Sequence, residues 1–260
     1  MTEQERLKQE TLSVRQALLA KLEEERKSKV ITLIHRKESW PWPEEGEKDE
    51  GKESITIEDT EHILMEIHQT PHDKPIDMIV HTPGGLALAA ETIAMALKQH
   101  QARVTAMVPF YALSGGTLIA LAADEIMMDR YSVLGPLDPQ IGGWPAVALI
   151  RLLERKPPEA ISDEMLILAD IAKLSVAQMK TFVKWLLEDR LPQDKRETIA
   201  EFLTGGYVTH DTPISLDSGW GLGLNVTEGL PEEVYQLFGT WKFGPCERPC
   251  LGCAVPQGAL

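Results

Sequence analysis

Two short segments carry residue types that could do chemistry: residues 81–85, with the sequence HTPGG, and residues 112–116, with the sequence ALSGG. A serine hydroxyl becomes a nucleophile when a base lies beside it. Glycines let backbone N–H groups approach a substrate closely, and such donors stabilise the oxyanion formed in acyl transfer. Each segment alone is typical of an ordinary turn or helix start. Their occurrence in consecutive strand–turn–helix units indicates a site.

The surrounding sequence alternates short apolar runs with amphipathic stretches. Strands are predicted at 30–35, 76–81, 103–110 and 125–135, and helices at 56–70, 87–101 and 116–124. Such apolar runs are typical of parallel strands that helices cover on both faces. The pattern therefore predicts an α/β fold with a largely parallel sheet. Ligand sites lie at the carboxyl ends of such strands, so the two glycine segments should lie side by side.

Ser114 is predicted to lie on a sharp turn that opens an apolar helix. There its hydroxyl is exposed and the following N–H groups point the same way. Gly84 and Gly85 let a second backbone N–H approach the same point. Such donors together form an oxyanion hole, which stabilises the transition state of acyl transfer. Neither segment distinguishes a protease from a hydratase.

Several longer segments resemble the Clp/crotonase-fold serine peptidases, among them IDMIVHTPGG, VTAMVPFYALSGGTLIALAADEIMMDRYSVLGPLDPQIGGWPA, DEMLILADIA and GYVTHDTPIS. Within that fold, residues 30–235 are most similar to the signal-peptide-peptidase-A-like branch and its serine dehydrogenase proteinase family. The resemblance implies a mostly parallel sheet of ββα units, with flanking helices and a helical C-terminal part. It also implies an ATP-independent serine endopeptidase. Ser114 matches the nucleophile, and Gly84 and Gly115 match the residues whose N–H groups form the oxyanion hole.

The general base is the least determined part of the predicted site. In Clp-type proteases a histidine follows the nucleophile by about two dozen positions, but this chain has Asp138 there, which argues against a Clp-type triad. The signal-peptide-peptidase branch uses a lysine farther along the chain, and Lys156 fits that spacing. Such a lysine must be held neutral by burial, whereas an ordinary lysine at a helix end is solvated. Lys173, His81 and His210 are the alternatives.

Three regions are predicted along the chain: a charged helix at 1–29, a Clp/crotonase-like peptidase domain at 30–240, and a cysteine-containing tail at 241–260. The tail holds all three cysteines, Cys246, Cys250 and Cys253, in a C-x3-C-x2-C pattern. Zinc or an iron–sulfur cluster would need a fourth ligand, and none is evident. We therefore expect free thiols, with no metal and no cofactor.

The composition limits the partners. The formal net charge of −14 disfavours nucleic acid, because phosphates would be repelled. Residues 104–123 are uncharged and long enough to span a membrane. Pro109 and the Ser-Gly-Gly turn interrupt them, so a strand, a turn and a helix are predicted instead of a span. The N-terminal sequence lacks the apolar core of a signal peptide, which favours the cytoplasm.

The predicted partner is a peptide or protein substrate. The resemblance implies a homo-oligomer, either a trimer, a hexamer or a larger ring. Two other functions use the same fold: a crotonase-type enzyme acting on acyl-CoA thioesters, and a catalytically inactive oligomeric scaffold. Crotonase-type enzymes need no nucleophilic serine, so the LSGGT segment favours the peptidase.

Overall fold

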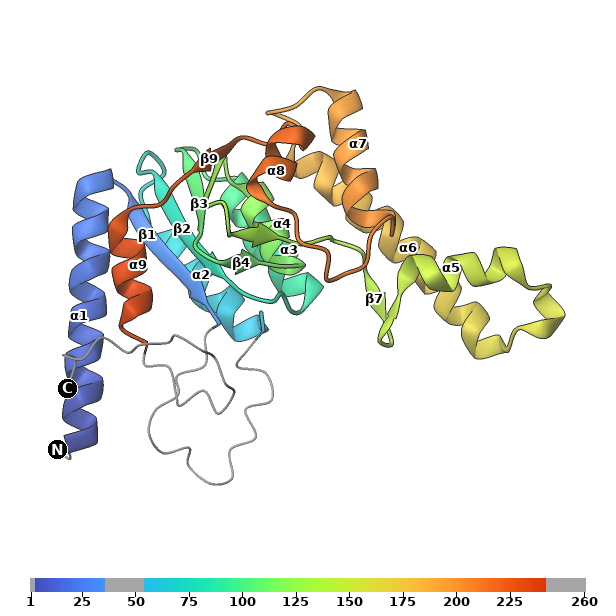
Figure 1. The fold of residues 1–260 in the computed structure, drawn as a ribbon, viewed down its shortest axis with the longest axis horizontal. Helices are drawn as coiled ribbons and strands as arrows, with labels where there is room; N and C mark the ends of the chain where they lie inside the picture. Colours follow the sequence, from blue (N-terminus) through green and yellow to red (C-terminus); the bar gives the residue numbers. More distant parts are fainter. Residues whose placement is uncertain (1–2, 36–53, 242–260) are drawn as a thin grey trace.

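The computed structural model describes residues 3–35 and 54–241 (Figure 1). Its strands are β1 (Lys29–Ile34), β2 (Ile76–His81), β3 (Val104–Val108), β4 (Tyr111–Ala112), β5 (Glu125–Met128), β6 (Val133–Leu134), β7 (Gln140–Ile141), β8 (Trp144–Pro145) and β9 (Val226–Glu228). Its α-helices are α1 (Glu3–Arg26), α2 (Ile57–Gln69), α3 (Ala87–Lys98), α4 (Gly115–Ala122), α5 (Ala146–Arg155), α6 (Asp163–Leu186), α7 (Gln193–Thr204), α8 (Leu216–Leu222) and α9 (Glu232–Gly239). The predictions for Cys246, Cys250 and Cys253 fall outside the described residues.

The centre of the molecule is a five-stranded sheet with the order β1-β2-β3-β5-β9. Every neighbouring pair in this sheet is parallel. Both β2 and β3 are buried along their whole length, which explains why their sequences are apolar runs instead of alternating patterns. The predicted α/β fold with a mostly parallel sheet is therefore confirmed.

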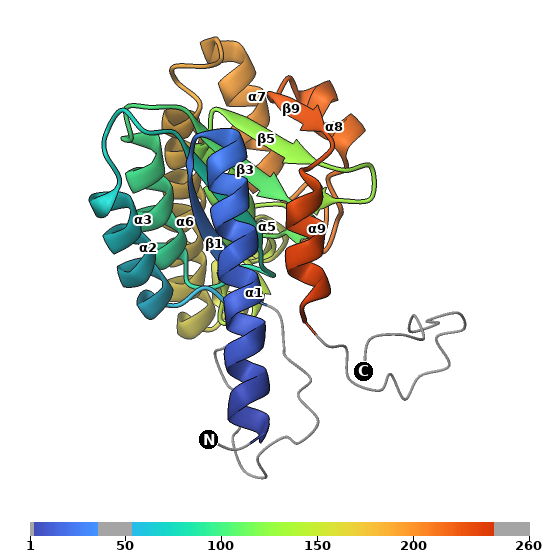
Figure 2. The ribbon, with the colours of Figure 1, turned by 90° about the vertical axis from the view of Figure 1, so that its left-hand side faces the viewer.

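Helices cover both faces of the sheet. Helices α2, α3 and α4 lie on one face with α6 and α7 beyond them, while α1 and α9 lie on the other face (Figures 1 and 2). Successive strand residues point to opposite faces. Ile79 of β2 and Met107 of β3 accordingly pack with Leu22 of α1 and Phe238 of α9. Met78 of β2 belongs to the larger cluster on the other face.

Helices α5 and α6 form an extension of the fold. The antiparallel hairpin of β7 and β8 leads into α5. Ala146 and Leu149 of α5 then pack with Ala169 and Ala172 of α6 in an apolar cluster of their own. Figure 1 shows this helix pair reaching away from the sheet. The predicted helical C-terminal part is confirmed, and its long helix α6 ends at Leu186.

Two regions were not predicted correctly or were not predicted at all. The strand predicted at 125–135 divides into β5 and β6, because the Ser132 N–H donates to the Asp129 carbonyl at 2.9 Å and closes a turn. The region 214–226, for which no element is predicted above, contains helix α8. Ser215 caps the start of α8, and Gly223 ends it in the left-handed conformation. Strand β9 has 3 residues, too few to give a recognisable sequence pattern.

The uncharged stretch at 104–123 folds as β3, β4 and α4 inside the protein. Among the residues that the structure describes, none of the helices is both long enough and apolar enough to cross a membrane. The prediction of a strand, a turn and a helix at this point is therefore confirmed.

Helix α1 packs against α9 of the same chain and ends at an ion pair whose carboxylate is buried. Arg26 donates to both carboxylate oxygens of Asp77 on β2, with 3.1 Å between Nη2 and Oδ1. The Ser28 hydroxyl donates to the same carboxylate at 2.6 Å. Asp77 is 2% exposed, so its charge depends on these partners. The interaction fixes the end of α1 to the sheet.

Replacing Arg26 with alanine should lower the free energy of unfolding by about 2–3 kcal/mol, because the buried Asp77 carboxylate loses its charged partner. Urea denaturation followed by circular dichroism measures this change. Arg130→Ala is the matched control, since it removes an ion pair on the surface. In that pair the Arg130 side chain is 71% exposed and the Glu228 side chain is 41% exposed. The control should cost less than about 1 kcal/mol. Equal losses in the two variants would contradict the role given to Arg26.

Candidate active site

Ser114 has a backbone conformation that residues other than glycine rarely adopt. Its φ is 49° and its ψ is −118°, at the position immediately before helix α4. Such a conformation costs energy and persists only where the surrounding structure enforces it. The Ser114 side chain makes no capping hydrogen bond to α4, so its hydroxyl is not used to start the helix. A strained serine between a strand and a buried helix is the geometry of a nucleophile turn.

The two glycine segments are joined by backbone hydrogen bonds. The Thr82 N–H donates to the Tyr111 carbonyl at 3.2 Å, and the Leu113 N–H donates to the Thr82 carbonyl at 2.9 Å. A Cβ atom placed on Gly84 would lie 2.8 Å from the Ser114 Cβ. Gly84 also has a φ of 108°. The prediction that the two turns lie side by side is confirmed, and glycine is required at position 84 by both space and conformation.

Some of the backbone N–H groups around Ser114 already donate a hydrogen bond within the protein, and others do not. The Gly84 N–H donates to the Thr82 Oγ1 at 3.1 Å. Within residues 3–35 and 54–241, the N–H groups of Gly85 and Gly115 have no acceptor. Gly85 and Gly115 also line the cavity beside Ser114. The predicted role of Gly84 as an oxyanion donor is not tested by this arrangement and stays a prediction.

A chain of hydrogen bonds lies behind the glycine turn. His35 Nε2 lies 3.2 Å from Asp59 Oδ2, and His35 Nδ1 lies 2.7 Å from Thr82 Oγ1. In the tautomer whose His35 Nε2–H donates to the Asp59 carboxylate, His35 Nδ1 accepts a hydrogen bond from the Thr82 hydroxyl. The Thr82 oxygen can then accept the hydrogen bond from the Gly84 N–H. The Asp59 side chain also accepts the N–H of Thr56 in the capping box of α2. The turn is thus tied to both β1 and α2.

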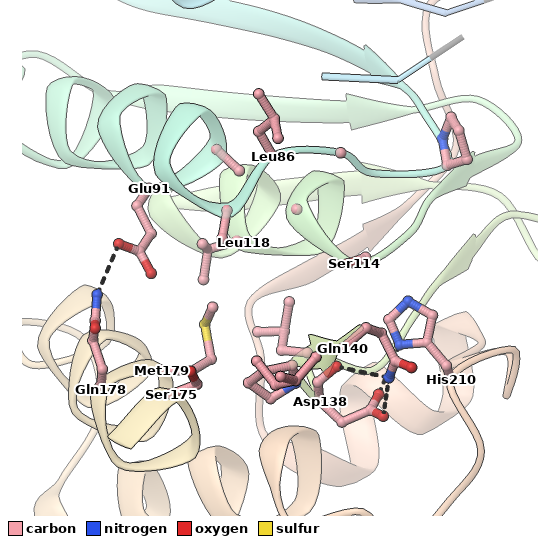
Figure 3. Close-up of a pocket in the computed structure, with 18 residues that line it drawn as sticks. Leu86, Glu91, Ser114, Leu118, Asp138, Gln140, Ser175, Gln178, Met179 and His210 are labelled. Carbon is pink, nitrogen blue, oxygen red and sulfur yellow. Dashed lines mark hydrogen bonds and ion pairs between the residues drawn. The ribbon is translucent and has the colours of Figure 1, made fainter. Parts of the chain in front are cut away.

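A cavity of about 490 Å³ opens beside Ser114 (Figure 3). Its volume is in the range typical of ligand sites. The lining from the glycine turns and from helices α3 and α4 comprises Pro83, Gly85, Leu86, Ala87, Ala90, Glu91, Ser114, Gly115 and Leu118. The remaining lining comprises Leu137, Asp138, Pro139, Gln140, Ile141, Ser175, Gln178, Met179 and His210. Most of the walls are therefore apolar, with polar groups at the two ends.

Asp138 and His210 form a hydrogen-bonded pair on the Ser114 side of the cavity (Figure 3). His210 Nδ1 lies 2.8 Å from Asp138 Oδ1. Asp138 is 4% exposed, and its Oδ2 accepts from Gln140 Nε2 at 2.8 Å. The hydrogen bond to Asp138 raises the pKa of His210, and partial burial acts in the opposite direction. With Nδ1–H donating to the carboxylate, the Nε2 lone pair is left available as a base.

Backbone pairing brings these two residues together from distant parts of the chain. Leu134 and Ile214 exchange backbone hydrogen bonds at 3.0 Å and 2.9 Å. This pairing brings together the segment after β6, which carries Asp138, and the segment before α8, which carries His210. Local sequence patterns contain no signal for such a contact, so the pairing of Asp138 with His210 was not predicted.

The other residues predicted as bases lie elsewhere. Lys156 is an exposed residue at the end of α5 and does not line the cavity. Lys173 is exposed on α6 and pairs with Asp170 at 2.9 Å. His81 is buried among aromatic side chains, with its ring 4.1 Å from that of Tyr111. In the single chain, Ser114 and His210 therefore line the same cavity and Lys156 does not, and the predicted role of Lys156 remains untested.

The fold and the site together define a class of protein: an α/β protein with a strained serine at the start of a buried helix and a glycine turn on the neighbouring strand. The chain belongs to the family of ClpP-like SDH-type serine proteinases, whose family model matches residues 1–256. The family predicted from the sequence is thereby confirmed, and serine peptidase activity is the activity of this family.

Two proteins of Methanocaldococcus jannaschii are similar over most of their length. Uncharacterized protein MJ0137 is 48% identical over 228 residues, which cover 86% of this chain and 77% of the relative. Uncharacterized protein MJ1495 is 48% identical over 222 residues, which cover 84% of this chain and 73% of the relative.

Two solved structures are more distantly similar. A mutant of the 1510-N membrane-bound stomatin-specific protease is 20% identical, covers 71% of this chain and 79% of that chain, and has a TM-score of 0.47. A mutant of ClpP1 from Listeria monocytogenes is 13% identical, covers 80% of this chain and 96% of that chain, and has a TM-score of 0.48. The family assignment therefore depends on the family model, and the fold assignment on the sheet topology.

Replacing Gly84 with alanine should slow the reaction of Ser114 with a fluorophosphonate reagent by about 100-fold, because the new Cβ displaces the serine from its position. Labelling kinetics followed by intact-protein mass spectrometry measure this rate. Gly142→Ala is the control, since Gly142 also has a positive φ but no atom within 4 Å of the added Cβ. The control should label at the wild-type rate. Normal labelling of the Gly84 variant would show that the close approach of the turns is not needed.

Proposed function

We propose that this protein is a serine endopeptidase in which Ser114 attacks the peptide carbonyl carbon. The observation that supports this most directly is the strained backbone of Ser114 at the mouth of a cavity that also contains the Asp138–His210 pair. A crotonase-type enzyme needs no nucleophilic serine, so the strain at Ser114 favours hydrolysis over acyl-CoA chemistry. An inactive scaffold would have no reason to maintain such strain beside an open cavity.

The oxyanion would be held by backbone N–H groups. Gly115 is the first donor, as predicted, because it follows Ser114 at the start of α4, where N–H groups lack helical partners. For the second donor we favour Gly85, because its N–H is unengaged and it lines the cavity. Gly84 would serve only if its bond to Thr82 opened, and it remains the alternative.

We propose His210 as the general base, with Asp138 orienting its ring. The proton of Ser114 Oγ passes to His210 Nε2 as the bond from Oγ to the carbonyl carbon forms. His210 then gives that proton to the departing amine as the peptide C–N bond breaks. Water hydrolyses the resulting ester with the same base. Lys156, the base predicted by resemblance, would need to reach Ser114 from a different conformation or from a neighbouring subunit.

A homo-oligomer in the cytoplasm is the setting we propose for this activity. An apolar stripe on α6 supports assembly: Ile167, Ile171 and Leu174 lie on one helix face and are 61%, 43% and 73% exposed. Exposed apolar stripes of this kind are typical of surfaces that contact another protein. Analytical ultracentrifugation of the full chain would determine the number of subunits.

Three variants separate the roles of the nucleophile and the base. Ser114→Ala should abolish fluorophosphonate labelling and peptidase activity. His210→Ala should reduce kcat/KM by about 100- to 10,000-fold, the usual contribution of a general base. Lys156→Met should leave kcat/KM unchanged. Retained labelling in Ser114→Ala would contradict the assignment of Ser114 as the nucleophile. Loss of activity in Lys156→Met, with activity retained in His210→Ala, would assign the role of general base to Lys156.

The pH dependence of kcat/KM gives a separate test of His210. The base must be neutral, so activity should rise with pH through a His210 pKa that the Asp138 hydrogen bond raises above its ordinary value. Asp138→Asn removes the carboxylate and should shift the acidic limb of the profile to lower pH, together with a loss of rate. An acidic limb that does not move in Asp138→Asn would exclude His210 as the titrating base.

A further inference from the structure

The end of the cavity remote from the Asp138–His210 pair has a chemistry that hydrolysis does not require. Figure 3 shows Glu91 of α3 and Gln178 of α6 facing each other there. Gln178 Nε2 lies 3.5 Å from Glu91 Oε2, the limit of a hydrogen bond. Ser175 of α6 also lines the cavity. The end of the cavity is therefore acidic and carries further polar groups.

Within the part of the chain that the structure describes, the Glu91 carboxylate has no cationic partner. Burial raises the pKa of Glu91, and the bond from Gln178 only partly opposes this effect. No lysine or arginine lines the cavity, and no ion pair involves Glu91 among the residues that the structure describes. A half-buried carboxylate gains most from a positive charge that arrives with a ligand. The site thus favours a cationic group at this position.

Between Ser114 and Glu91 the walls are apolar. Leu118 and Met179 lie between these two residues in Figure 3, and Ala90 also lines the cavity. A ligand that fits must therefore combine an apolar stem with a terminal positive charge. Lysine and arginine side chains have this composition. The net charge of −14 also favours cationic substrates over acidic ones.

We infer that the cavity binds a lysine or arginine side chain of the substrate, with its charge at Glu91 and Gln178. The inference rests on the proposed peptidase function. Ser114 and Gly115 line this cavity, and we assign the side chain that enters it to the residue whose carbonyl is attacked. Glu91 then determines specificity and takes no part in bond breaking.

A metal site does not explain this end of the cavity. Among the described residues, no group of three or more histidine, cysteine, aspartate or glutamate side chains is placed to hold an ion. Gln178 and Ser175 are neutral, so Glu91 is the single charged group there. One carboxylate beside an amide and a hydroxyl suits an ammonium or guanidinium group, to which all three can offer acceptor oxygens.

Acetylated peptidyl diphenyl phosphonates test the inference, because they react with the serine and need no turnover. Four such reagents are compared, in which the residue that carries the phosphorus has the side chain of lysine, arginine, norleucine or citrulline. We expect the lysine and arginine reagents to label Ser114 at least about tenfold faster than norleucine and citrulline, a difference of about 1.4 kcal/mol. In Glu91→Gln this preference should fall to about onefold. Glu61→Gln, an exposed position on α2, is the matched control.

The outcomes separate the inference from the proposed function. Equal labelling by all four reagents in the wild type, or an unchanged preference in Glu91→Gln, overturns the lysine or arginine subsite while Ser114 remains the nucleophile. Failure of a small fluorophosphonate to label Ser114 overturns the proposed function itself. Repeating the series with a free α-amino group in place of the acetyl cap tests the other source of positive charge. A preference that follows the free amine and not the side chain also overturns the inference.

Discussion

The contact between the two glycine turns is the constraint on which the site depends. Hydrogen bonds of Thr82 with Tyr111 and Leu113 hold the ends of β2 and β3 together beyond the sheet. Only a glycine at position 84 leaves room for the Ser114 Cβ. Because the turns are held on both sides, the strained backbone of Ser114 cannot relax without breaking this pairing.

The rest of the fold supports that contact from several directions. Helix α4 is buried along its whole length, so the start of the helix cannot shift without disturbing the core. On the opposite side of the turn, the bonds from Asp59 through His35 to Thr82 connect the glycine segment to β1 and α2. The turn is therefore held by hydrogen bonds and packing on several sides, an arrangement that the proposed oxyanion donors would require.

The sequence predicted most of the sheet and the part of the site that follows it. Apolar runs identified β1, β2, β3 and β5, because strands buried on both faces must be apolar along their length. Ser114 and the glycines were found because a turn between strand and helix depends on neighbouring residues. Short elements were missed: β9 pairs with β5 over 3 residues, and α8 depends on its Ser215 cap and on packing more than on a long amphipathic pattern.

The local sequence alone therefore indicated where the serine turn lies, since a serine followed by two glycines after an apolar strand is a pattern of adjacent residues, whereas the strained conformation of Ser114 also needs the neighbouring turn. The tertiary structure decided which side chains face that serine. Asp138 and His210 meet because Leu134 and Ile214 pair across a long stretch of chain, and Glu91 faces Gln178 because α3 and α6 border the same cavity. Contacts of this kind depend on how whole elements pack, and no local periodicity encodes them.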